Sequence, residues 1–160
     1  MNRVAVALAL LSFWATPTFA AELCGSFSTD VDDRSGPPVL FWSDMSADEE
    51  TAVTESPGKG HAEFSLDRKT LRLSWTLTFQ GLDSQVLGIG LYGPAPPGNE
   101  GGLIYDLGKE RAGNAAKGSV VVQDSDVTNI VHDKYYVNIT TKKYPRGELR
   151  GPIKRHPPKC

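Results

Sequence analysis

The chain has 160 residues, with 17 lysines and arginines against 19 aspartates and glutamates, and a formal net charge of -2. This length suits one domain with a core of ordinary size, and 39% apolar with 22% charged residues excludes wholesale disorder. The slightly acidic balance also argues against a general nucleic-acid-binding protein, which usually carries a strongly basic surface.

Residues 1–20 have the pattern of a secretory signal peptide. Arg3 supplies a positive charge, residues 4–14 form an uncharged apolar run, and the small residue Ala20 precedes the expected cleavage point. Neither this run nor any later segment reaches the roughly 20 apolar residues that a transmembrane helix needs. We therefore expect a periplasmic or secreted protein that begins at Ala21 and has no transmembrane segment. A retained N-terminal anchor is the alternative.

The two cysteines, Cys24 and Cys160, lie near the two ends of the expected mature chain. An oxidising compartment favours a disulfide between them. Two free or intermolecular thiols are the alternative. A redox role is disfavoured because the sequence has no Cys-x-x-Cys pattern.

The first predicted strand covers residues 39–43, and the strongest pattern follows it. Residues 62–67 and 71–79 alternate strictly between apolar and polar side chains, which is typical of strands with one buried face. Only the short polar segment 67–70 separates them, so they are predicted to form a β-hairpin.

Further short strands are predicted between turns that are rich in glycine and proline. They cover residues 86–92, 103–107, 119–123, 135–140 and 148–153. The only helical signal is residues 126–132, with Asp126 as a possible N-cap. This pattern predicts an all-β fold with one short helix, an antiparallel Greek-key β-sandwich of immunoglobulin-like or superoxide-dismutase-like type.

Four sequence blocks stand out in the second half of the chain. They are residues 91–98 (LYGPAPPG), 103–108 (LIYDLG), 135–139 (YYVNI) and 144–151 (YPRGELRG). In this order the blocks resemble the CHRD (chordin-type) domain, in the form found in exported bacterial proteins. The positions that carry the resemblance are Tyr92, Gly93, Pro94, Asp106, Gly108, Asn138, Gly147, Glu148, Arg150 and Gly151.

The resemblance covers residues 39–153, and leaves an N-terminal extension (residues 21–38) and a basic tail (residues 154–160) outside the domain. It implies an extracellular β-sandwich that binds a partner and performs no defined reaction. Animal proteins with this domain are secreted antagonists of growth factors, and the bacterial relatives are mostly without an assigned function. We therefore expect an exported binding module with a protein or another envelope component as its partner. A degenerate metal-handling protein is the alternative.

The sequence departs from the family pattern where many bacterial members carry histidines. Those positions are Gly90, Tyr92 and Thr140 here, and none of them is an imidazole ligand. The mature chain's histidines, His61, His132 and His156, lie in three separate segments without a metal-ligand spacing. No catalytic motif is visible either, so the sequence predicts no enzyme active site, no cofactor and no specific metal site.

Glu148 and Arg150 are two residues apart in a predicted strand, so their side chains are expected to share a face. We expect them to pair through a charge-assisted hydrogen bond at the end of the domain. Recognition of a ligand carboxylate by Arg150 is the alternative.

Overall fold

The computed structural model describes residues 34–157, which form a ten-stranded antiparallel sheet with one short α-helix. The helix α1 (Asp124–Val131) lies between the seventh and eighth strands, and a 3₁₀ turn, η1 (Ala47–Glu49), follows the first. The strands are β1 (Val39–Ser46), β2 (Lys59–Asp67), β3 (Arg72–Gln80), β4 (Val86–Gly93), β5 (Gly102–Asp106), β6 (Arg111–Ala112), β7 (Ala115–Val121), β8 (Tyr136–Thr141), β9 (Leu149–Pro152) and β10 (Lys154–Arg155).

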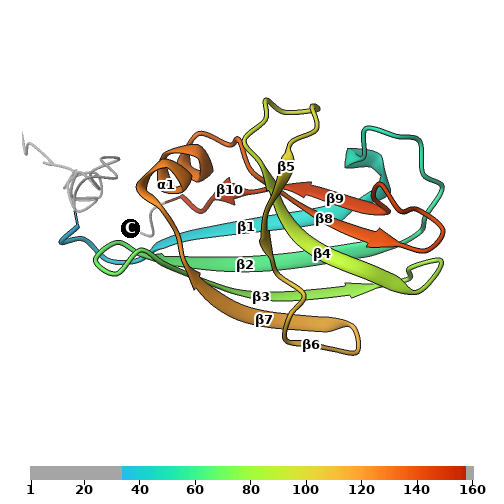
Figure 1. Cartoon of the computed structure of the whole chain (residues 1–160), viewed down its shortest axis with the longest axis horizontal. Helices are drawn as coiled ribbons and strands as arrows, with labels where there is room; N and C mark the ends of the chain where they lie inside the picture. Colours follow the sequence, from blue (N-terminus) through green and yellow to red (C-terminus); the bar gives the residue numbers. More distant parts are fainter. Residues whose placement is uncertain (1–33, 158–160) are drawn as a thin grey trace, which may run out of the picture. The chain divides into compact units, whose positions relative to one another are not determined.

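The strand order across the sheet is β5-β4-β8-β9-β1-β2-β3-β7-β6, with β10 paired to β1. The sheet curls, so that β4, β5, β8 and β9 lie across the half made of β1, β2, β3 and β7 (Figure 1). The two halves join where β9 meets β1, at the pair Ser46 and Arg150. The all-β antiparallel class with one short helix is thus confirmed, while the finer prediction of a Greek-key sandwich stays a prediction.

The predicted hairpin is confirmed as β2 and β3, which pair from Lys59 opposite Gln80 to Asp67 opposite Arg72. The Asp67 carboxylate accepts hydrogen bonds from the backbone N–H groups of Lys69 and Thr70, which fixes the turn. Leu71, expected as the first residue of the second strand, belongs to this turn instead and has a left-handed φ of 54°.

The core lies between the two halves of the curled sheet. Trp75 of β3 links them directly, because its Nε1 donates a buried hydrogen bond of 3.1 Å to the carbonyl of Leu107 after β5. The largest fully buried side chains come from both halves: Tyr135, Phe41, Met45, Leu66, Leu73, Leu77, Leu91, Leu107, Ile130, Ile139, Leu149 and Ile153.

Two predicted elements begin earlier than expected. The strand predicted over residues 119–123 is β7, and it starts at Ala115 because the turn at Gly113, with φ 58°, already reverses the chain. The helix starts at Asp124, so Asp126 is not its N-cap. The carboxylate of Asp126 lies inside the first turn and accepts the backbone N–H of Gln123 at 3.0 Å.

Several expectations concern the two ends of the chain. The signal peptide, most of the N-terminal extension, and both Cys24 and Cys160 lie outside the described residues. The segment assigned to the basic tail begins with β10, which pairs with Phe41 and Trp42 of β1. Within residues 34–157, no helix has the length and apolar character needed to cross a membrane.

Candidate functional site

The structure gathers several motif residues on the outward face of β4, β8 and β9. Neighbouring positions Leu91, Val137 and Leu149 belong to the core, so the alternate side chains point away from it. Across the strands, Asn138 pairs with Arg150, and Tyr92 pairs with Tyr136. We call the side chains of Tyr92, Tyr136, Asn138 and Arg150 the motif face.

Glu148 is fully buried immediately before β9. Its Oε1 accepts hydrogen bonds from the hydroxyl of Ser56 at 2.6 Å and from the backbone N–H of Asp83 at 2.7 Å. Its Oε2 accepts a hydrogen bond of 2.5 Å from the hydroxyl of Thr141 at the end of β8. Uncharged donors from three different segments therefore replace the water that a buried carboxylate loses.

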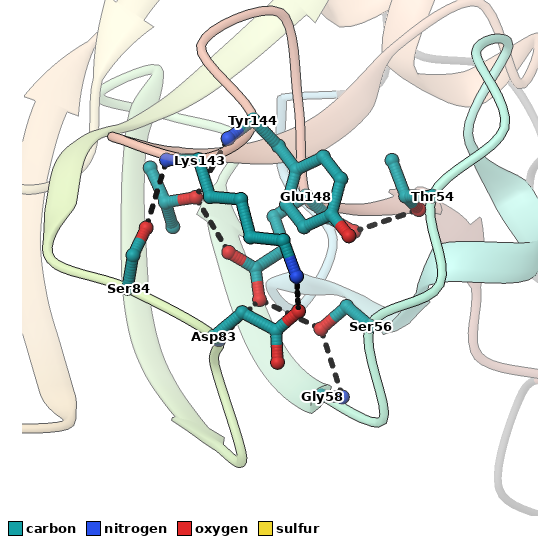
Figure 2. A network of polar contacts seen from close by, with 9 residues as sticks. Thr54, Ser56, Gly58, Asp83, Ser84, Lys143, Tyr144 and Glu148 are labelled. Atoms are coloured by element: carbon teal, nitrogen blue, oxygen red, sulfur yellow. Dashed lines mark hydrogen bonds and ion pairs between the residues drawn. The ribbon is translucent and has the colours of Figure 1, made fainter.

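Further bonds around Glu148 tie the same loops together (Figure 2). Lys143 holds the loop before β4, because its Nζ lies 2.6 Å from the Asp83 carboxylate and its backbone N–H donates to the hydroxyl of Ser84. On the other side, the hydroxyl of Ser56 accepts the backbone N–H of Gly58. The Glu148 network is therefore a structural clamp on the loops 50–58 and 81–85.

Arg150 forms a second centre, on the motif face. Its side chain is only 5% exposed, and its guanidinium carbon lies 3.6 Å from the centroid of the Tyr136 ring. That ring stacks on Tyr92, with 5.6 Å between centroids and 16° between planes. Arg150 also donates to the carbonyl of Asn99 at 2.6 Å, and the Tyr136 hydroxyl accepts the N–H of Gly101. Arg150 and Tyr136 thus fix the glycine- and proline-rich loop before β5.

The expected bond between Glu148 and Arg150 is not formed. Glu148 lies before β9 and turns to the hydroxyls of Ser56 and Thr141, whereas Arg150 lies within the strand and turns to Tyr136. Each charged group is satisfied by its own set of partners, so the two residues serve two separate centres.

Glu50, just after η1, lies close to the motif face. Burial raises the pKa of its carboxyl to about 7, although the positive charge of Arg150 works in the opposite direction; Glu100 adds to the rise. Oε1 of Glu50 and Oδ1 of Asn138 are buried, and neither has a hydrogen-bond partner among the residues that the structure describes. A carboxyl with these surroundings changes its charge near neutral pH.

Two glycines of the YPRGELRG block allow this close packing. Gly147 has φ 152°, and a Cβ there would lie 2.4 Å from Oε1 of Glu50 and 2.6 Å from Nδ2 of Asn138. A Cβ at Gly151 would lie 2.4 Å from the backbone oxygen of Asp44 on β1. Any larger residue would push the neighbouring segments apart.

A cleft of about 330 Å³ lies beside the motif face, along β4 and β5. Above Gly90, which has no side chain, the ends of Leu103 and Tyr92 occupy the space that a Cβ would need. The exposed apolar side chains of Leu87 and Leu103 line the cleft together with the charged side chains of Asp106 and Arg111. Its lining residues are Val86, Leu87, Gly88, Ile89, Tyr92, Leu103, Asp106, Gly108 and Arg111.

The remaining motif positions shape the loops around this cleft. Gly93 and Pro94 end β4, and the Asp106 carboxylate accepts the N–H of Gly108 at 2.8 Å after β5. One known family model spans all of these blocks, which lie on or next to β4, β5, β8 and β9. That model, the CHRD domain, matches residues 41–153. The chain belongs to the CHRD domain family. Comparison with curated proteins and with solved structures gives no match.

In this CHRD domain the positions at which the resemblance would place histidines lie on neighbouring strands. Gly88 pairs with Thr140 and Gly90 with Asn138 between β4 and β8. Thr140 donates its hydroxyl to the carbonyl of Gly88, and Leu103 and Tyr92 close over Gly90. This part of the domain therefore presents an apolar and phenolic surface in place of imidazoles.

Sequence reasoning missed three of the important residues: Glu50, Ser56 and Asp83. All three lie in irregular segments, where no periodic pattern indicates which way a side chain points. The contact between Ser56 and Glu148 joins positions 92 residues apart, so no local signal identifies it.

Proposed function

We propose that this CHRD domain is an exported, non-enzymatic binding module of the cell envelope, whose partner is a protein or another envelope component. The observation that carries the proposal is the structural role of the two charged residues in the closing motif. Glu148 and Arg150 hold loops in place, and the two hydroxyls bound to the Glu148 carboxylate lie in the interior, with Ser56 8% exposed and Thr141 fully buried. A rigid scaffold with shaped loops is what a binding module needs.

The cleft along β4 and β5 is the surface that we assign to binding. Leu87 and Leu103 are each 57% exposed, next to the half-buried ring of Tyr92. Asp106 and Arg111 add one charge of each sign to the same cleft. Aromatic and apolar side chains with a polar rim are typical of protein interfaces.

A photo-reactive amino acid at position 103 of the exported protein should cross-link to one defined component in the envelope of the source organism. Position 121 is the matched control, because Val121 is 56% exposed and lies on β7. The captured complex should weaken at least about tenfold with Leu103→Asp and stay unchanged with Val121→Asp. Equal cross-linking from both positions, or none from position 103, would contradict the assignment of the cleft.

Export itself gives a separate prediction. The mature protein, isolated from the periplasm or the medium, should have the intact mass of a chain that begins at Ala21. Thiol titration after unfolding should find no free sulfhydryl, because Cys24 and Cys160 are oxidised to a disulfide in that compartment. Full-length chain in the cytosol, or two titratable thiols in fresh periplasmic material, would contradict this part of the proposal.

A further inference from the structure

Two histidines from distant parts of the sequence meet at one carboxylate on the outward face of β10, β1 and β2. Nε2 of His61 lies 3.0 Å from Oε1 of Glu63, and Nε2 of His156 lies 2.9 Å from Oε2 of the same residue. His61 and Glu63 are two apart on β2 and point to the same side, while His156 follows β10. Its backbone N–H donates to the carbonyl of Leu40, which fixes it beside β1.

A second carboxylate orients one of these imidazoles. Asp44 pairs with His61 across β1 and β2, and its Oδ1 lies 2.6 Å from Nδ1 of His61. A carboxylate on Nδ1 leaves Nε2 as the nitrogen that faces Glu63. Histidines that bind metals very often have such a carboxylate on the other ring nitrogen, because it fixes the ring and the tautomer.

The side chains therefore form a known type of donor set. Two imidazole nitrogens and one glutamate carboxylate bind zinc in sites whose fourth position holds water. The same ligands suit copper(II), which binds nitrogen donors more strongly than zinc does. The third histidine, His132, is not part of the cluster, because its Nδ1 lies 2.7 Å from the carbonyl of Thr128 on α1.

We propose that His61, Glu63 and His156 form a site for one divalent transition-metal ion of the zinc class, with Asp44 positioning His61. This site goes beyond the proposed binding function and uses different residues. It departs from the expectation, drawn from the sequence, that the protein has no specific metal site.

The site has to close around the ion. Within residues 34–157, no three histidine, cysteine or acidic side chains already stand at the spacing of a bound metal. The Glu63 carboxylate now lies between the two imidazoles, and the metal replaces these contacts with bonds of about 2.0–2.2 Å. The side chains of His61 and Glu63 are each 48% exposed and that of His156 is 33% exposed, so they have room to rotate.

The test uses the mature protein, purified without an affinity tag and stripped with a chelator. Titration calorimetry with zinc chloride at pH 7.5 should give one site per chain, with a Kd of about 10 µM or tighter. At about 100 times that concentration, zinc should raise the melting temperature by several degrees. His61→Ala and His156→Ala should each weaken binding at least about tenfold, and Asp44→Asn by about tenfold, through the loss of its positioning bond.

His132→Ala is the matched control and should bind zinc like the wild type. Because none of the four substituted side chains is buried, far-UV circular dichroism of the variants should match that of the wild type. Binding that survives both His61→Ala and His156→Ala would overturn the proposal, and a metal held by Cys24 and Cys160 would give that result. The absence of a one-to-one site in the wild type would overturn it too.

Discussion

Replacing Glu148 with alanine should lower the free energy of unfolding by about 4 kcal/mol, because two buried hydroxyls and one part-buried N–H lose their acceptor together. The buried hydroxyls of Ser56 and Thr141 would then lie in a cavity without the carboxylate that satisfies them. Hydrogen bonds to charged groups contribute about 1.5–3 kcal/mol each and do not add fully, which sets this magnitude. Urea unfolding, followed by the fluorescence of Trp42 and Trp75, measures the difference.

Two other variants distinguish the effect of losing the hydrogen-bond network from the effect of losing a glutamate as such. Glu110→Ala removes an exposed carboxylate and should change stability by less than about 0.5 kcal/mol. Ser56→Ala removes one of the three donors and should lower stability by about 1–1.5 kcal/mol, since the carboxylate keeps its other two bonds. A loss below about 1 kcal/mol for Glu148→Ala would contradict the interpretation of Glu148 as a clamp.

The fold class was predictable from sequence because strand pairing here follows local patterns. The period of two over residues 71–79 gives both the strand and its buried face, and the short turn before it gives the hairpin. The errors lie at element ends, where side-chain bonds decide the boundary. Asp67 fixes a turn that includes Leu71, and Asp126 binds the N–H of Gln123 from inside the helix.

The candidate sites were less predictable, because they depend on contacts between distant segments. The motif identified Glu148 and Arg150, but their partners Ser56 and Asn99 come from loops without a periodic pattern. Glu63 and His156 are 93 residues apart, and only the pairing of β10 with β1 brings them together. The spacing of the histidines along the sequence therefore does not show which of them lie near the same carboxylate, whereas the strand order does.

The second large effect concerns the dependence of stability on pH at Glu50. Burial raises the pKa of its carboxyl from an ordinary value of 4.5 to about 7 in the folded protein. Between these two values the unfolded chain has released the proton and the folded chain still holds it. The contribution of Glu50 to stability is therefore largest at acid pH, falls as the pH rises from about 4.5 to about 7, and stays unfavourable above that.

Glu50→Gln should remove this penalty, since the amide fills the same space and carries no charge. At pH 8 the variant should be more stable than the wild type by about 1–3 kcal/mol, a range that allows for solvent reaching the half-buried carboxyl. At pH 5 the two proteins should differ by less than about 0.5 kcal/mol, because Glu50 is then mostly protonated in the folded wild type.

The comparison must be made as a difference between variant and wild type at each pH, by urea unfolding. The pKa values of Glu63, Glu100 and Asp126 are lowered in the folded protein, so these groups make the whole protein less stable in acid and would hide the effect of Glu50. Glu63 and Asp126 contribute equally to both proteins and cancel in the difference, whereas Glu100 acts on the charge of Glu50 and belongs to the measured effect. Glu49→Gln, an exposed neighbour, should show no such dependence on pH. If Glu50→Gln were less stable than the wild type at pH 8, the attraction between Glu50 and Arg150 would outweigh burial, and the carboxyl would be charged throughout the neutral range.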